Sequence, residues 1–122
     1  MGRGAKTGVV ALVREDGTVV CPRCAVAATP LRRMKGLLGR SELPPGEGLL
    51  LRPGSSIHMF FMRFPIDAVF LDREHVVRKV VPDLKPWRLA SARGAKSVVE
   101  LAAGEATRHG IAPGQRLTLA EI

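Results

Sequence analysis

Apolar residues in this chain occur in short runs that are separated by turn signals rich in Gly, Pro and Asp. Runs of roughly four to eight residues with many β-branched and aromatic members are typical of β-strands. Many such strands at close spacing favour a sandwich or a barrel. The expected strands are residues 9–13, 18–21, 49–51, 57–62, 66–71, 76–81, 97–101 and 116–120.

Residues 57–62 form the expected central strand. Positions on both faces of this run are apolar, as in a strand that is buried between two layers. The surrounding segment, residues 58–72, holds all four Phe of the chain and two of its four Met, so it carries most of the bulky core material. After a break at Pro65, the strand at 66–71 is expected to pair with this central strand.

A hairpin and two short helices complete the expected fold. The Asp-Gly pair at 16–17 predicts a tight turn between the first two strands. A first helix is expected at residues 29–38, which open with a Thr-Pro capping pair, and a second at residues 103–109, which end at Gly110. We therefore predict a mainly β fold, a small single-domain β-sandwich or barrel with one or two short helices.

The length of 122 residues suits one domain, 1–122, and residues 1–7 are expected to form a flexible basic tail. No apolar run approaches the roughly 20 residues that a membrane helix needs. The N-terminus lacks the apolar stretch of a secretory signal. We expect a protein that does not insert into a membrane and that resides in the cytoplasm.

The net charge of +8 is concentrated toward the N-terminus, because residues 1–40 hold eight Lys or Arg and two acidic residues. Such a basic region can attract polyanions, in a manner that salt weakens. The chain has one Trp and no Tyr, and its Phe residues fall in expected core strands. Few rings would remain for stacking on bases, so the sequence disfavours nucleic acid as a partner.

Cys21 and Cys24 form a Cys-x-x-Cys pair, which is the sharpest local motif. Such a pair can be two inert thiols, a redox dithiol or half of a zinc site. Arg23 would stabilise a thiolate, but the strand-helix-strand context of redox dithiols is missing. Two cysteines cannot complete a zinc site. A monomer would need two of the three histidines, His58, His75 and His109, which lack ligand spacing, so zinc is expected mostly through a dimer, and no other cofactor is expected.

Polar residues around the predicted central strands provide a candidate ligand site. Asp67 begins an apolar strand, and a buried carboxylate needs a partner. The loop at residues 84–96 is long for a compact domain, and such loops are often functional. The candidate ligand-binding residues are His58, Arg63, Asp67, Trp87, Arg88 and Glu100.

Structural interpretations of these candidates stay open. Asp67 would accept backbone N–H bonds at the Pro65 corner or pair with a neighbouring arginine. His58 would be a hydrogen-bonded core residue, Trp87 would cap the core, and Glu100 would face water. The same residues therefore fit either a pocket or an ordinary scaffold.

No nucleophile, base and orienting group can be assembled from the sequence, and its glycines form no phosphate-binding loop. The leading hypothesis is a non-enzymatic module that binds a small molecule or another protein. The alternative is a thiol-dependent redox enzyme or a zinc-binding protein that uses Cys21 and Cys24.

Five segments in a fixed order carry a family resemblance, namely residues 33–40, 58–72, 84–88, 97–104 and 109–115. With these segments the chain resembles the bacterial and archaeal domain-of-unknown-function family 192, from about residue 21 onward. The resemblance implies a jelly-roll-like β-sandwich and no established activity, cofactor or partner. The chain departs from the family at Gly114-Gln115, where Gly-Asp is frequent, and at Arg63-Phe64, where one branch has Asn-Thr.

Overall fold

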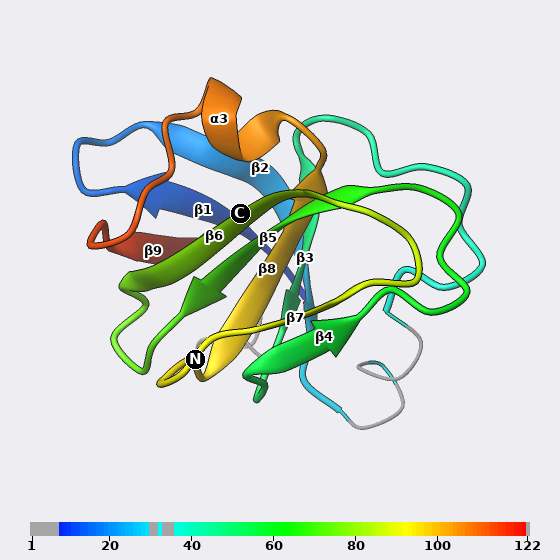
Figure 1. Ribbon diagram of the computed structural model, residues 1–122. Helices are drawn as coiled ribbons and strands as arrows, with labels where there is room; N and C mark the ends of the chain where they lie inside the picture. Colours follow the sequence, from blue (N-terminus) through cyan, green and yellow to red (C-terminus); the bar gives the residue numbers. More distant parts are fainter. Residues whose placement is uncertain (1–7, 30–31, 33–35, 122) are drawn as a thin grey trace.

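The computed structural model describes residues 8–29, 32 and 36–121. Its elements in chain order are β1 (Val9–Arg14), β2 (Val19–Ala27), β3 (Glu47–Leu51), β4 (Ser56–His58), β5 (Ile66–Leu71), β6 (Val77–Leu84), β7 (Leu89–Ser91), β8 (Ser97–Ala102), α3 (Glu105–Arg108) and β9 (Leu117–Glu121). Seven strands form one curled sheet in the order β6-β5-β8-β3-β2-β1-β9, and β4 pairs with β7 in a small second sheet (Figure 1). The prediction of a mainly β fold is confirmed.

The two edge strands of the large sheet meet at one end. Val76 and Arg116 form an antiparallel bridge, and Leu117 donates a backbone hydrogen bond of 2.9 Å to the carbonyl of His75. This contact joins β6 to β9 and turns the curled sheet into a half-barrel. Closure also satisfies backbone groups that an open edge would leave unpaired.

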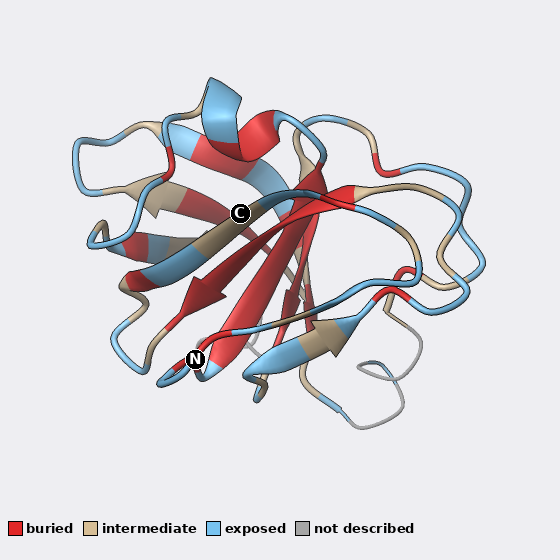
Figure 2. Cartoon of the chain, in the orientation of Figure 1, coloured by how far each residue is buried: buried red, intermediate tan, exposed pale blue. Residues whose placement is uncertain are grey.

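Strands β5 and β8 lie in the middle of the molecule, and all their residues are buried (Figure 2). Successive side chains of a strand point to opposite faces, so each strand contributes to two apolar clusters. Val69 and Val99 belong to the cluster inside the curl, whereas Phe70 and Val98 belong to the cluster that faces β4 and the preceding loops. The half-barrel therefore has a core on each side of its central strands.

The predicted central strand at 57–62 is wrong. Strand β4 ends at His58, and the chain then turns, with Met62 donating a 3.2 Å backbone hydrogen bond to the carbonyl of Met59. Met59 is buried, but Phe61 is 72% exposed. An apolar run on both faces fits an apolar loop as well as a buried strand, so the pattern alone did not distinguish them.

The strand at 66–71 is confirmed as β5, although its partners are β6 and β8. Strand β6 continues past Pro82, where the sequence indicated an end, and Asp83 has a φ of 52° at a break in its register with β5. Proline is tolerated there because β6 is an edge strand. The loop at 84–96 also contains the short strand β7.

The hairpin at residues 9–21 is confirmed, with β1 and β2 antiparallel and Gly17 at a φ of 89°. The second helix is confirmed in a shorter form as α3, and Ile111 donates to the carbonyl of Ala106 just after its end. Half of the first helix, residues 30, 31 and 33–35, lies outside the described residues, as does the 1–7 tail, and residues 36–38 form a turn. At its expected start, Thr29 Oγ1 accepts a 3.2 Å hydrogen bond from the backbone N–H of Arg32.

Candidate functional site

Asp67 is fully buried, and its carboxylate is saturated by backbone donors. Oδ1 accepts a 2.8 Å hydrogen bond from the N–H of Asp83, and Oδ2 accepts bonds of 3.0 and 2.8 Å from Gly104 and Ala106. The carboxylate therefore ties β5 to β6 and to the start of α3. Asp67 therefore accepts backbone hydrogen bonds, as one of its two structural interpretations expected. The donors, however, lie at residues 83, 104 and 106 and not at the Pro65 corner.

Asp67 and Glu100 lie on opposite faces of the sheet. Asp67 pairs across the strands with Leu101, which belongs to the inner cluster, whereas Glu100 pairs with Ala68, which belongs to the outer one. Neighbouring positions on a strand alternate between faces. The structure thus does not bring the two candidate acids into one site.

Glu100 lines a cavity of about 180 Å³ between the large sheet and β4. Its walls combine apolar side chains with polar groups, and they come from the large sheet, from the segment around β4 and from the loop that follows residue 35. Besides Glu100, the cavity is lined by Leu37, Ser56, His58, Met59, Met62 and Val98, among others. A concave site with apolar side chains and a few polar groups is the usual form of a small-molecule site.

The Glu100 carboxyl is the most perturbed polar group of this cavity. The residue is 7% exposed, and no hydrogen-bond donor contacts its side chain among the described residues. Burial raises the pKa of Glu100 to about 7, because the charged form loses its hydration. A titratable group with such a shift inside a pocket is a candidate functional residue.

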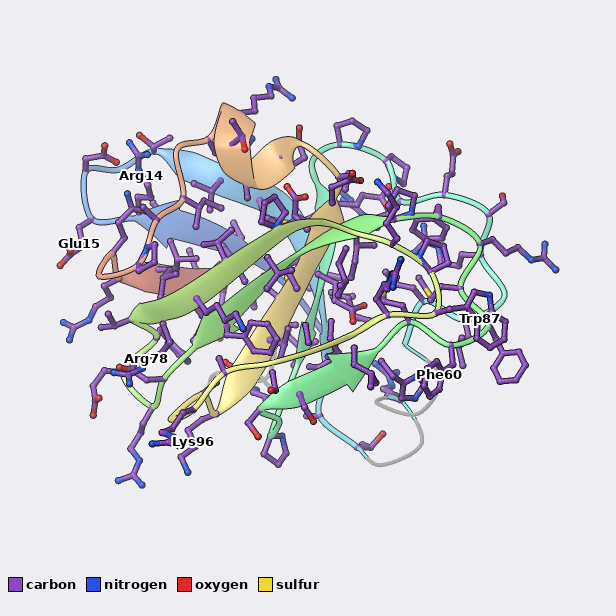
Figure 3. The ribbon with its side chains drawn as sticks, in the orientation of Figure 1. Arg14, Glu15, Phe60, Arg78, Trp87 and Lys96 are labelled. Carbon is purple, nitrogen blue, oxygen red and sulfur yellow. The ribbon has the colours of Figure 1, made fainter. Side chains whose placement is uncertain are left out.

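His58 lies at the rim of the same cavity and is exposed, so it is not a core histidine. Its Nδ1 accepts a 3.3 Å hydrogen bond from the N–H of Phe60, and its ring stacks on the Phe60 ring with centroids 4.8 Å apart. Trp87 does not cap the core either, since it is 58% exposed and contacts the rings of Phe60 and Phe61. Figure 3 labels Phe60 and Trp87 at the same end of the molecule.

Arg63 and Arg88 are exposed on the two loops that carry these rings. Within the described part of the chain, neither guanidinium takes part in an ion pair, so Arg63 does not pair with Asp67. The backbone joins the loops instead, because Met59 donates a 2.8 Å hydrogen bond to the carbonyl of Arg88.

Cys21 and Cys24 are free thiols on β2, and both are buried in the inner cluster. A break in the register between β1 and β2 falls between them. A hydrogen bond to Cys21 and burial raise the pKa of Cys24. Among the described residues, no three His, Cys, Asp or Glu side chains are placed to hold a metal ion.

Sequence reasoning missed Met59, Met62 and Leu37 as cavity walls, and Phe60 and Phe61 as exposed rings. The apolar segment at 58–64 carries the relevant signal, but its pattern equally fits a core strand. Nothing local in the sequence indicates which of these side chains turn inward.

A family model described as "Uncharacterized ACR", that of the domain-of-unknown-function family 192, matches residues 11–119. The chain belongs to this family. A family relative in Thermococcus sibiricus, a UPF0127 protein, is 38% identical over 99 residues. That match covers 75% of the chain and 62% of the relative, so the chain spans less than two thirds of its length.

Two crystal structures share the fold of this family 192 chain. A "putative transcription regulator" from Sinorhizobium meliloti 1021 superposes with a TM-score of 0.80 at 25% identity, covering 91% of this chain and 92% of that one. A protein of unknown function from Novosphingobium aromaticivorans DSM 12444 gives a TM-score of 0.77 at 27% identity, covering 90% and 83%. Neither likeness assigns an activity to the chain.

Proposed function

We propose that this chain is a non-enzymatic binding module whose cavity, lined by Glu100, takes a small apolar ligand with a cationic amine. The observation that carries the proposal is the buried Glu100 carboxyl, which faces a cavity with several apolar side chains and has no hydrogen-bond donor among the described residues. A carboxylate in such surroundings is unfavourable until a cation or a set of donors pairs with it. A ligand ammonium group would provide that partner.

The walls of the cavity suit the rest of such a ligand. Met59 and Met62 have flexible, polarisable side chains that adapt to different apolar shapes. Leu37 and Val98 add branched apolar surface. The volume of about 180 Å³ exceeds that of an engineered cavity of roughly 150 Å³ that binds benzene, so a single-ring amine is a suitable size.

The thiol alternative has less support. Reactive thiols are partly exposed and have a lowered pKa. The hydrogen bond between the two thiols lowers the pKa of Cys21 and raises that of Cys24, but Cys24 has no exposed surface. A zinc site shared between two chains would also require both sulfurs to reach the surface. Cys21 is as inaccessible as Cys24.

Benzylamine is a suitable probe, with benzyl alcohol as its neutral counterpart. We expect benzylamine to shift the methyl NMR signals of Met59 and Met62 and to bind at least about tenfold more tightly at pH 8 than at pH 5, because Glu100 ionises around pH 7. Benzyl alcohol should bind weakly and without this pH dependence.

Two variants distinguish binding in the cavity from a general attraction between benzylamine and acidic residues of the protein. Glu100→Gln should abolish the pH dependence of benzylamine binding, whereas Glu74→Gln removes an exposed carboxylate on a turn and should leave it unchanged. Equal affinity for benzylamine at pH 8 in the native protein and in Glu100→Gln would reject the proposal.

A further inference from the structure

Three aromatic side chains are exposed together at the ends of two neighbouring loops. Phe60, Phe61 and Trp87 are 37%, 72% and 58% exposed, and we call them the aromatic tip. The centroids of Phe60 and Phe61 lie 5.9 and 4.9 Å from that of Trp87. Figure 3 places the labelled members at the end opposite Arg14 and Glu15.

The backbone holds the aromatic tip outward. Trp87 donates a 2.7 Å hydrogen bond to the carbonyl of Met59, which fixes the second loop against the first. Phe61 and Trp87 have φ angles of 66° and 71°. Bulky residues rarely adopt this left-handed region, and strained backbone tends to occur at functional positions.

Cations surround the aromatic tip. The loop segments at 57–64 and 84–93 contain no acidic residue. The basic residues next to the rings in sequence, Arg63, Lys85 and Arg88, are exposed, whereas Arg93 follows β7 at the other end of the small sheet. Lys85 pairs with Asp83 at the end of β6, while Arg63 and Arg88 make no ion pair within the described residues. The surface is therefore apolar at its tip and positive around it.

We infer that the aromatic tip binds the surface of a membrane that contains anionic lipids. The rings would occupy the interfacial layer, where Trp is favoured, and the arginines would contact lipid phosphates. No helix among the described residues has the length and apolar character that a membrane crossing requires. A contact made by these exposed side chains is peripheral.

Size and ring geometry favour a lipid surface over a macromolecular partner. An aromatic side chain buries about 150 to 250 Å², so three partly exposed rings offer only a few hundred Å², below the roughly 800 Å² per partner of a stable protein interface. Stacked bases need free ring faces. Here Phe60 already stacks on His58, and Phe61 contacts Trp87.

Trp87 is the only tryptophan of the chain and reports directly on the aromatic tip. Vesicles of phosphatidylcholine with phosphatidylglycerol should shift its emission to shorter wavelength and co-sediment with the protein at low salt. Vesicles of phosphatidylcholine alone should bind at least about fivefold less, and added salt should weaken binding to the anionic vesicles.

Phe61→Ser keeps the reporter and removes the most exposed ring, so it should lower partitioning into anionic vesicles at least about fivefold. Val19→Ser is the matched control, because Val19 is 45% exposed on β2 and lies outside the tip. Arg63→Gln with Arg88→Gln should also weaken binding. The same charge change at the exposed Arg73 and Arg116 should have a smaller effect.

Three outcomes would overturn the inference. One is the absence of any emission shift or co-sedimentation with anionic vesicles at low salt. Another is partitioning that Phe61→Ser leaves unchanged. The third is an emission change with a single-stranded oligonucleotide but not with vesicles, which would assign the aromatic tip to nucleic acid.

Discussion

Glu100 and Asp67 are both buried carboxyl groups of the central strands, yet their surroundings give them opposite roles. Asp67 accepts three backbone hydrogen bonds, whereas Glu100 faces a cavity without a donor among the described residues. Hydrogen bonds to a carboxylate compensate its lost hydration, and an apolar cavity does not. Asp67 thus supports the fold, and Glu100 destabilises it when charged.

Stability should therefore depend on pH through Glu100. The folded-state pKa of about 7 exceeds the ordinary value of 4.5, so the folded state holds the proton more tightly than the unfolded state. The stability that the protonated Glu100 gives to the folded state is fully present below about pH 4.5 and is lost as pH rises through 7. We expect Glu100→Gln to be more stable than the native chain at pH 8, by up to about 3 kcal/mol, but not at pH 4.5.

Urea unfolding of both proteins between pH 4.5 and 8 measures this difference. The Glu74→Gln variant serves as the control, since Glu74 is exposed. A difference between the native chain and Glu100→Gln that stays constant with pH would contradict the prediction.

Asp67→Asn should destabilise the protein by about 1 to 3 kcal/mol, because the amide nitrogen would face backbone donors that the carboxylate now satisfies. Asp83→Asn is the control, since the Asp83 side chain is exposed and, among the described residues, its one ion pair is with Lys85. That change should cost less than about 1 kcal/mol. If Asp67→Asn and the native chain unfold at the same urea concentration, the hydrogen bonds of Asp67 do not stabilise the fold.

At the scale of elements, strand β2 determines how the two thiols behave. Cys21 and Cys24 have no exposed surface, so a thiol reagent can react with them only when the strand opens locally. We expect alkylation by iodoacetamide to be on the order of a hundredfold slower than in urea that unfolds the chain. Rapid alkylation under native conditions, or a disulfide that forms under mild oxidation, would restore the redox alternative.

Elements with strong local signals could be predicted from the sequence, and those fixed by tertiary contacts could not. Strand β5 and the β1–β2 hairpin follow from apolar runs bounded by turn residues. The segment 57–62 has a similar pattern but carries its rings on a turn, since Met59 packs inward while its backbone bonds to the 87–88 loop. Propensity does not encode that long-range contact.

The candidate site was predictable only in part for a related reason. His58 and Glu100 line one cavity, as candidates of the same site should, but Asp67 faces the other cluster. Which residues meet depends on strand register, and Glu100 comes opposite Ala68 through the pairing of β5 with β8. A shift of one residue would exchange the faces, and nothing in either strand alone specifies the register.

At the scale of the whole molecule, the half-barrel predicts an order of local stability. Strands β5 and β8 are hydrogen-bonded on both sides and buried on both faces, whereas β4 and β7 form a separate sheet of three residues per strand. Local opening is easiest where few buried contacts and few backbone hydrogen bonds must break. The small sheet should therefore open well before the central strands.

Hydrogen exchange followed by mass spectrometry measures this order. Amides of β5 and β8 should exchange slowest, at rates set by global unfolding, and those of β4 and β7 should exchange on the order of a hundredfold or more faster. Because the small sheet carries His58 at the cavity rim and joins the two loops of the aromatic tip, a ligand such as benzylamine should slow exchange in β4 more than in β9. If β4 and β7 exchange as slowly as β5, the small sheet is part of the rigid core, and neither the cavity nor the tip can open independently of it.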